Sequence, residues 1–377
     1  MKNGWQTRRL ADFALVVSTG PFGSILHKSD YVEDGVPLVN PINIVGERIV
    51  PNPLKLISGV TKRRLSNYVL KEGDVVVGRR GEIGRCAVVG SNENGWVCGT
   101  GSFFVRPLQT LNPQFLAHLI RADAYREKLE QLSTGATMKN LSNAALGDLA
   151  ISVPSVPEQR RIVGILNEAF EGIAAAKANA EKNLQNARAI FESHLQSVFT
   201  QRGPEWVEKP LGEVCTLQRG FDLPTHLRQE GRVPLVTSNG ITDTNNVWKV
   251  KGPGVVTGRS GSIGNVFFIK DDFWPLNTTL YVKDFHGNDP AFIYRLLIQF
   301  DLGKHATGAG VPTLNRNFVH YKPVRIPVDI SVQRALTEKL NDLESETKRL
   351  ADIYHRKLTV LEALKKSLLH QAFSGKL

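Results

Sequence analysis

Residues 73–84 read GDVVVGRRGEIG, and residues 254–264 read GVVTGRSGSIG. Each stretch is a β-branched run that ends in a Gly-Arg-x-Gly turn, and the two turns lie 180 positions apart. Such runs followed by glycine turns predict strands, and the apolar segments 86–89 and 266–269 complete two predicted hairpins. A motif that recurs at a long offset indicates that one structural unit is used twice.

Further matches extend this repeat over most of the chain. The offset is 201 near the N-terminus, 180 at the glycine turns and 173 or 174 beyond them. The two copies therefore differ in length mainly between Leu38 and Lys71, where the first copy is longer. The matched residues are Trp5 and Leu10 with Trp206 and Leu211, Thr134-Gly135-Ala136 with Thr307-Gly308-Ala309, and Gln159-Arg160 with Gln333-Arg334.

Each copy ends in a long segment with a helical apolar stripe, and the two stripes match without a gap at an offset of 174. Their steps are 4, 3, 4, 3, 4, 4 and 3 in both copies. This period is helical, and the double step of four is a stutter that relaxes supercoiling at one shared level. The residues that we expect to pair the helices are Ile162, Leu166, Ile173 and Leu184 in the first segment and Leu336, Leu340, Leu350 and Leu358 in the second.

The length of these helical segments leaves two interpretations. About 44 residues at 1.5 Å each make a rod of roughly 66 Å, which is far longer than the helices of a compact domain. In one interpretation each helix packs on its own domain. In the other the two rods pair antiparallel, and the alanine-rich stretch 174–180 favours this pairing because small side chains permit close approach. We therefore predict an antiparallel coiled coil.

The predicted fold class is α+β, with two mixed α/β lobes separated by two long helices in an internal two-fold repeat. The predicted boundaries are 1–154 for the first lobe, 155–203 for the first helix, 204–328 for the second lobe and 329–377 for the second helix. A length of 377 residues suffices for several domains. The chain is 41% apolar and 22% charged, which is typical of a folded protein rather than a disordered one.

The formal net charge of +11 points to a polyanionic partner. Residues 1–154 hold 18 basic and 13 acidic side chains, and residues 200–328 hold 15 and 11. Residues 155–199, in contrast, hold five of each. The lobes therefore carry the excess positive charge, and we expect double-stranded DNA as their partner.

Basic and amide side chains on turn-rich stretches are the candidates for DNA contacts. Such side chains bind phosphates, and Arg and Asn also read base edges through two hydrogen bonds. For the arginines of the glycine turns, pairing with a structural carboxylate is an equal alternative. The candidates are Lys62, Arg63, Arg64, Arg79, Arg80, Lys139 and Asn140 in the first lobe, and Asn239, Lys249, Lys251, Arg259 and Arg316 in the second.

Motifs for catalysis are missing from the sequence. It contains neither a G-x-x-x-x-G-K-[ST] phosphate loop nor an H-E-x-x-H metal motif. Asp74 and Glu82 flank a turn as nuclease carboxylates do, but Ser262 replaces Glu82 in the second copy. Residues 289–292 are similar to the catalytic tetrapeptide of amino-methyltransferases, yet no glycine-rich cofactor loop accompanies them. We therefore predict no catalytic residues, no metal site and no cofactor.

The cysteines and the apolar runs bear on the compartment. Three widely spaced cysteines argue against a disulfide framework, and we expect them to be small buried residues. The longest apolar runs have about five residues, whereas a membrane helix needs ~20 and a signal peptide core ~7–15. We therefore predict a cytoplasmic protein without a membrane partner.

The order of these elements resembles the specificity subunit of a type I restriction-modification system. The resemblance rests on the G-D-x-x-x-x-R-x-G-x-I-G turn at 73–84, the T-G-A segments at Thr134 and Thr307, and the segment 151–159 that opens the first long helix. It covers essentially the whole chain. The second copy departs at 326–333, where the Pro-Glu-Gln of the first helix entry is absent.

The resemblance implies a non-catalytic DNA-recognition subunit. Each lobe would be a target recognition domain that reads one half of a split, asymmetric DNA site, and the helix pair would act as a spacer. Methyltransferase subunits, two in number, and restriction-translocase subunits would be recruited around it. A rod of roughly 66 Å also suits lobes that reach major grooves one to two turns of ~34–36 Å apart.

Two other classes of function compete with this interpretation. A stand-alone sequence-specific repressor or architectural protein would bind DNA without any methyltransferase partner. A self-sufficient nuclease or methyltransferase is disfavoured by the missing motifs.

Overall fold

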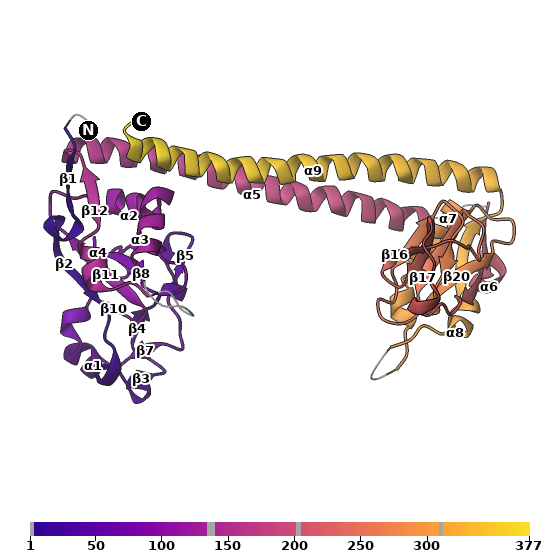
Figure 1. Cartoon of the computed structure of the whole chain (residues 1–377), viewed down its shortest axis with the longest axis horizontal. Coiled ribbons are helices and arrows are strands. Elements are labelled where there is room, and N and C mark those ends of the chain that lie inside the picture. The colour runs from indigo at the N-terminus through magenta and orange to yellow at the C-terminus, as the bar shows by residue number, and fades with distance from the viewer. Residues whose placement is uncertain (1–3, 134–139, 201–204, 309–311) are drawn as a thin grey trace. The chain divides into compact units, whose positions relative to one another are not determined.

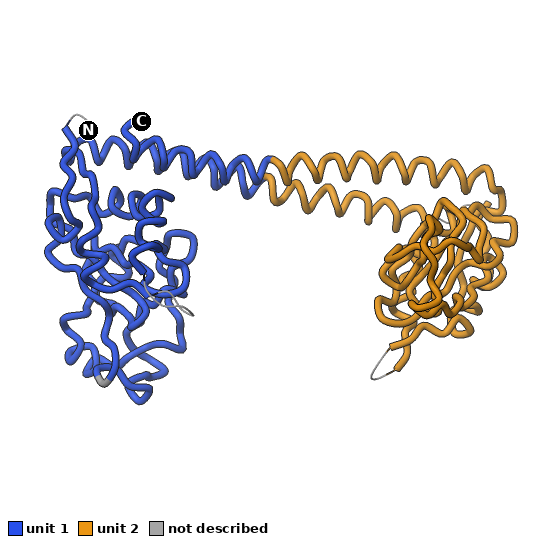
Figure 2. Tube along the Cα trace, viewed as in Figure 1, with its two compact units in different colours: residues 1–179, 357–377 blue, residues 180–356 orange. Residues whose placement is uncertain are grey.

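The computed structural model describes residues 4–133, 140–200, 205–308 and 312–377 of an α+β chain. The chain divides into two compact units (Figure 2): unit 1 is Met1–Asn179 with Lys357–Leu377, and unit 2 is Ala180–Arg356. The two predicted long helices are α5 (Val156–Thr200) and α9 (Ile330–Ser374), with 45 residues each (Figure 1). Each of them begins in one unit and continues into the other.

Unit 1 contains two four-stranded sheets, with orders β2-β11-β8-β9 and β10-β4-β7-β3, a β1-β12 pair and a β5-β6 hairpin. The strands are β1 (Gln6–Arg9), β2 (Ala14–Thr19), β3 (Tyr31–Val32), β4 (Val36–Val39), β5 (Ile44–Val45), β6 (Arg48–Ile49), β7 (Leu56–Ile57), β8 (Val75–Gly78), β9 (Cys86–Val88), β10 (Val97–Cys98), β11 (Ser102–Pro107) and β12 (Ala150–Val153). The short helices are α1 (Gly59–Arg64), α2 (Pro113–Arg121), α3 (Asp123–Gln131) and α4 (Asn143–Gly147).

The valine run of β8 is buried on both faces of its sheet. Val75 and Val77 belong to the core that includes α2, whereas Val76 belongs to a second core with Phe104. Successive side chains of a strand point to opposite faces, so a strand covered on both faces reads as an unbroken apolar run. β8 pairs antiparallel with β9, which confirms the first predicted hairpin.

Unit 2 contains a four-stranded sheet of order β14-β20-β17-β18, a three-stranded sheet of order β16-β15-β19 and a β13-β21 pair. β17 pairs antiparallel with β18, which confirms the second predicted hairpin. The strands are β13 (Trp206–Pro210), β14 (Thr216–Arg219), β15 (Val233–Thr237), β16 (Gly240–Asn245), β17 (Gly254–Gly258), β18 (Val266–Ile269), β19 (Trp274–Pro275), β20 (Thr279–Asp284) and β21 (Pro323–Pro327). The short helices are α6 (Leu211–Val214), α7 (Pro290–Phe300) and α8 (Arg316–His320).

The predicted length difference between the copies has a local cause. Between β4 and β8, unit 1 carries the β5-β6 hairpin, β7 and α1. Between β15 and β17, unit 2 carries the single strand β16. The sheets β2-β11-β8-β9 and β14-β20-β17-β18 have the same strand order. The extra residues of the first copy therefore form additional elements outside this shared sheet.

Within unit 1, the N-terminal part of α5 and the C-terminal part of α9 pack together. Ile162 and Leu166 share a core with Leu369 and Ala372. Arg161 Nη2 donates to Leu377 O at 2.9 Å, and Lys177 Nζ donates to Glu362 Oε1 at 2.6 Å. The α9 partner thus moves to lower numbers as α5 moves to higher ones, so the two segments run antiparallel within this unit.

Within unit 2, the other parts of the same helices pack together. Leu195 and Val198 of α5 share a cluster with Leu340 of α9, and Leu336 packs against it. Of the residues expected to pair the helices, Ile162, Leu166 and Leu340 are buried, and Ile173, Leu184, Leu336 and Leu358 are half-buried.

Leu350 is the exception among these residues because its side chain is 37% exposed. It lies at the stutter, where the buried stripe passes from Thr347 to Tyr354. Ala351 is half-buried at this level. The buried side of α9 runs from Thr347 to Ala351, a step of four residues, and then to Tyr354, a step of three. Leu350 lies off this path and is therefore exposed to solvent.

A buried glutamine fixes the start of each long helix to its own lobe. Gln159 Oε1 accepts from Asn112 N at 2.7 Å, and Gln333 Oε1 accepts from Asp289 N at 2.9 Å. Both glutamines are fully buried. Their side-chain amides also donate to carbonyls at the ends of β12 and β21, Pro154 O and Pro327 O, at 2.9 Å. These bonds explain why Gln recurs at this point of both copies.

Candidate nucleic-acid interface

Each Gly-Arg-x-Gly turn depends on glycines with a left-handed backbone. Gly81 and Gly84 have φ of +74° and +86°, and Gly261 and Gly264 have φ of +82° and +91°. Other residues rarely adopt this region, whereas glycine does so without steric cost. The turns therefore present the arginine that follows each central strand in the same way in both units.

The arginine of the first turn is held by main-chain groups. Arg79 N donates to Gly101 O at 2.9 Å, and Leu141 N donates to Arg79 O at 3.2 Å. The side chain is half-buried, and its Nε donates to Leu141 O at 3.1 Å. The structure therefore brings Arg79, Arg80 and Asn140 together, because Arg80 and Asn140 form an isolated β-bridge.

The arginine of the second turn has the same kind of support. Arg259 N donates to Thr278 O at 2.9 Å, and Leu314 N donates to Arg259 O at 2.8 Å. Its Nη1 donates to Asn277 O at 3.2 Å. Both turn arginines thus bond to backbone carbonyls, and the structural carboxylate that the sequence left open as a partner is not observed in the described part of either unit.

The other candidates of the first lobe lie mainly on α1, which is a short helix and not the turn that the sequence suggested. Arg63 is exposed and Lys62 is half-buried. Arg64 forms an ion pair with Asp30 and donates to Ile25 O at 2.7 Å, so its side chain ties α1 to a neighbouring loop. Lys139 lies outside the described residues, as does the segment 134–136.

The other candidates of the second lobe are exposed. Asn239 Oδ1 accepts from Ser262 Oγ at 2.5 Å, so this amide lies against the second glycine turn. Lys249 Nζ lies 5.1 Å from the centre of the Trp274 ring. Lys251 follows in the same loop, before β17.

Two of the predicted residues share a pocket with an arginine that the sequence did not single out. Arg259 and Arg316 line a pocket of about 700 Å³ in unit 2 together with Arg219 from the end of β14. Arg219 is the last residue of the short strand β14, which contains no repeated motif, so the sequence contained no signal for it. Only the fold brings the three arginines to one place.

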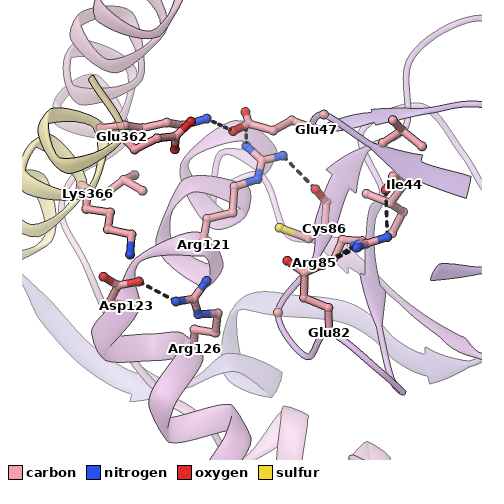
Figure 3. A pocket seen from close by; sticks show the side chains of 15 residues that line it. Ile44, Glu47, Glu82, Arg85, Cys86, Arg121, Asp123, Arg126, Glu362 and Lys366 are labelled. Atoms are coloured by element: carbon pink, nitrogen blue, oxygen red, sulfur yellow. Dashed lines mark hydrogen bonds and ion pairs between the residues drawn. The ribbon is translucent and has the colours of Figure 1, made fainter. Parts of the chain in front are cut away.

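A pocket in unit 1 has a different character (Figure 3). It has a volume of about 460 Å³, and its charged lining has both signs. Asp123 binds Arg126 at 2.9 Å, and Glu82 pairs with Arg85. The basic groups of this pocket are therefore largely neutralised by adjacent carboxylates, which makes it a poor site for a phosphate.

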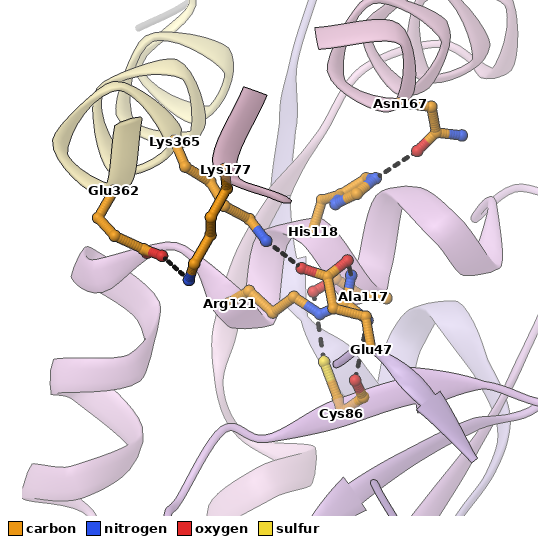
Figure 4. A network of polar contacts seen from close by, with 9 residues as sticks. All are labelled: Glu47, Cys86, Ala117, His118, Arg121, Asn167, Lys177, Glu362 and Lys365. Atoms are coloured by element: carbon orange, nitrogen blue, oxygen red, sulfur yellow. Dashed lines mark hydrogen bonds and ion pairs between the residues drawn. The ribbon is translucent and has the colours of Figure 1, made fainter. Parts of the chain in front are cut away.

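Some of the residues that line this pocket form a polar network that joins the β5-β6 hairpin, α2 and α9 within unit 1 (Figure 4). Glu47 binds Arg121 Nη1 at 2.8 Å and Lys365 Nζ at 2.6 Å. Burial opposes the charge of this carboxyl, but Arg121 and Lys365 still hold the pKa of Glu47 below its usual value. Arg121 Nη2 also donates to Cys86 O at 2.8 Å. The network stabilises the hairpin against the end of α9.

His118 lies next to this network on α2 and contacts α5. One ring nitrogen, Nε2, lies 3.0 Å from Asn167 Oδ1, and the other, Nδ1, is buried and has no hydrogen-bond partner among the described residues. Burial, together with the adjacent Arg121, lowers the pKa of His118 to about 4. A proton on Nδ1 would be a buried donor without an acceptor, so the ring is neutral at physiological pH.

Unit 1 is expected to lose stability in mild acid because of His118. The folded-state pKa lies below the value of ~6.5 for an exposed histidine, so the unfolded chain binds the extra proton first. Stability is fully present above pH ~6.5 and declines by about 3 kcal/mol as the pH falls towards ~4. Thermal unfolding at pH ~7 and ~4.5 measures this loss.

The matched control for this measurement is His118→Gln, which keeps a donor for Asn167 and cannot take up a proton in this range. Carboxylates such as Glu47 titrate in both proteins, so only the difference between them reports on His118. An equal acid-induced loss in the wild type and the variant would contradict the assignment.

Asp74 and the three cysteines have structural roles. Asp74 is buried and binds Arg106 Nη2 at 2.7 Å, so it is committed to an ion pair in the core. All three cysteines are buried and free, as predicted, and burial raises the pKa of Cys86 to about 11. In the described ranges, no group of three or more His, Cys, Asp or Glu side chains is placed to hold a metal ion.

A search of the helices in the described part of the chain finds none whose length and apolar character would let it cross a membrane.

Two solved structures share this fold over the whole chain. One is a chain from work described as the structural basis underlying complex assembly and conformational transition of the type I R-M system. It matches with a TM-score of 0.80 and 18% identity over 100% of this chain and 99% of its own. The HsdS subunit of Thermoanaerobacter tengcongensis matches with a TM-score of 0.67 and 18% identity over 100% and 98%. The fold is therefore that of the HsdS class of proteins.

The sequence identifies the family. The model of the type I restriction modification DNA specificity domain matches residues 2–184 and 204–355. These matches cover most of the chain, which belongs to this family.

Curated relatives are similar over shorter segments. The StySPI specificity subunit of Salmonella potsdam is 31% identical over 87 residues, which are 22% of this chain and 19% of the relative. The EcoBI specificity subunit of Escherichia coli is 23% identical over 177 residues, which are 47% of this chain and 36% of the relative. The matches thus span less than two thirds of either relative.

Proposed function

We propose that this chain is the DNA-recognition subunit of a type I restriction-modification complex. One observation carries the proposal: the DNA specificity domain model matches the chain twice, and each match contains a glycine turn with a half-buried arginine. The excess of basic side chains in both lobes is consistent with a DNA partner. Family membership gives no support to the stand-alone repressor that the sequence left open.

In this proposal, residues 1–154 and 204–328 are two target recognition domains, and each reads one half of a split DNA site. The two halves differ in sequence, because α1 and the β5-β6 hairpin have no counterpart between β15 and β17. The candidate contacts are those predicted from the sequence, of which Arg79 and Arg259 act partly by holding the turns in place.

Residues 155–203 and 329–377 form the spacer of the proposed site. We infer that they pair as an antiparallel coiled coil along their length, and that the whole chain is an internal two-fold repeat. The antiparallel contacts inside unit 1 and the α5-α9 cluster inside unit 2 support this inference.

The chemistry belongs to partners in this proposal. The chain recruits two methyltransferase subunits and the restriction-translocase subunits, and works in the cytoplasm. It supplies sequence recognition and geometry but no catalytic group of its own.

Sequencing of methylated adenines in the host genome tests the function. Deletion of the gene is expected to remove methylation at one bipartite motif, and an intact copy is expected to restore it. A matched test in vitro mixes the purified chain with S-adenosylmethionine and duplex DNA. We expect methyl transfer only when methyltransferase subunits are added. An unchanged set of methylated motifs in the deletion strain, or transfer by the chain alone, would contradict the proposal.

A further inference from the structure

One pocket of unit 2 has only arginines as its charged lining. Arg219, Arg259 and Arg316 line it together with the amide side chains of Gln218 and Asn315, and Phe221 adds an apolar wall. Its volume is about 700 Å³, and no Asp or Glu is among its lining residues. The pocket of Figure 3, in contrast, pairs its basic groups with carboxylates. We call Arg219, Arg259 and Arg316 the arginine seat.

Main-chain contacts preorganise two members of the arginine seat. Arg316 Nη1 donates to Leu217 O at 3.2 Å, so its side chain reaches from α8 to strand β14. Arg259 Nη1 donates to Asn277 O at 3.2 Å. In the described part of the chain, the remaining guanidinium nitrogens of both have no acceptor. Each of the two guanidinium groups is thus held through one nitrogen, and its other N–H donors are free to bind a ligand.

Arg219 completes the arginine seat and is more loosely held. Its Nη2 lies 3.2 Å from Asp222 Oδ1, and both side chains are more than half exposed. Such surface pairs contribute at most ~1 kcal/mol. A phosphate group can replace the contact between Arg219 and Asp222, because an Arg side chain binds two phosphate oxygens through two parallel hydrogen bonds.

We propose that the arginine seat binds the phosphodiester backbone of duplex DNA beside the half-site read by unit 2. This inference rests on the proposed function and adds to it the residues that bind the backbone. Three guanidinium groups, of which only Arg219 has a carboxylate partner among the described residues, fit a polyanion, and the amides of Gln218 and Asn315 are suited to further phosphate oxygens. Backbone contacts of this kind hold the protein in register but do not read sequence.

The corresponding positions of unit 1 lack two of the three arginines. Gly20 N donates to Ser102 O as Gly220 N donates to Thr279 O, which makes Thr19 the counterpart of Arg219. Leu141 N donates to Arg79 O as Leu314 N donates to Arg259 O, which makes Asn143 the counterpart of Arg316. At these three positions the proposed phosphate contacts are therefore unequal between the two units.

The test uses the intact chain and a fluorescein-labelled duplex of mixed sequence, with binding measured by anisotropy over a range of KCl concentrations. Each phosphate contact contributes about 0.9 to the slope of log K against log salt. We expect Arg219→Gln and Arg316→Gln each to reduce the slope by about 1 and to weaken binding about tenfold.

Two control variants keep the comparison specific. Arg349→Gln removes one positive charge from α9, where the side chain is 70% exposed, and is expected to leave the slope unchanged. Asn143→Arg adds to unit 1 one of the two arginines that it lacks and is expected to raise the slope by about 1. This gain cannot result from misfolding, and thermal unfolding checks that the loss variants fold.

The outcomes distinguish a failure of the proposed function from a failure of the arginine seat inference. If the wild-type chain fails to bind the duplex even at low salt, the proposed function fails. If the wild type binds but the arginine seat variants bind with the same slope as Arg349→Gln, the inference fails and the proposed function stands. Unchanged DNA binding with weaker recruitment of methyltransferase subunits would assign the arginine seat to a protein partner and overturn the inference.

Discussion

Insertion of four residues after Ala180 is expected to abolish methylation, whereas a second insertion of four after Tyr354 restores it at a longer spacer. Both units pair α5 with α9 internally. An insertion in one helix shifts one part of its stripe by ~6 Å, so at least one unit must lose its pairing. The loss of a buried apolar seam of this size costs several kcal/mol.

The double insertion keeps the two stripes in register. The proposed spacer then lengthens by ~6 Å, and at ~3.4 Å per base pair the preferred gap between half-sites grows by one or two base pairs. Methylation of a set of duplexes with graded spacers measures this, with thermal unfolding as the check on folding. If the doubly lengthened protein folded normally and methylated only the original spacing, the helices would not set the distance between half-sites.

Replacement of residues 1 to about 150 by the same region of a relative is expected to change one half-site and leave the other half-site and the spacer unaltered. Each altered base pair costs ~1–3 kcal/mol, so three or more changes weaken recognition of the old site by at least about a hundredfold. The methylated motifs of a host that carries the chimera report both halves at once.

The structure indicates how this chimera should be controlled. Residues 357–377 contribute to the core of unit 1, and Lys365 binds Glu47 of the exchanged region. Two chimeras are therefore needed. One keeps residues 357–377 of this chain, and the other has the corresponding residues of the relative. We expect the same new motif from both and higher stability from the second. A change in both half-sites would contradict the assignment of one half-site to each lobe.

The sequence predicts regular and repeated elements well, because their pattern is periodic and local. The two hairpins that contain the glycine turns, and the two helices of 45 residues, could be predicted from short-range sequence patterns. The recurrence of Gln159 at Gln333 is visible in the sequence, although its role in holding a backbone N–H is not. Leu350 was expected to face a partner and is exposed, because the stutter allows a path through Ala351 that a fixed step pattern does not show.

The candidate site could be predicted only in part. Arg79 and Arg259 lie in a repeated motif and are recognisable for that reason. Arg219 has no motif and joins Arg259 and Arg316 through the pairing of strands that are distant in sequence. The pairing of Arg64 with Asp30 is equally non-local, and composition alone could not separate this structural arginine from one that is free to bind DNA.

The packing of α9 against unit 1 has a consequence for the synthesis of the chain. Leu369 and Ala372 close the core of a unit whose other residues end at Asn179, and all of unit 2 is translated in between. At ~5–20 residues per second, the ribosome needs about 10–40 s to proceed from the end of the first segment of unit 1 to the second. During that interval the nascent first lobe has an open apolar face next to Ile162 and Leu166. A chain that terminates before α9 therefore keeps this face exposed, and we expect it to be bound by chaperones or degraded by proteases.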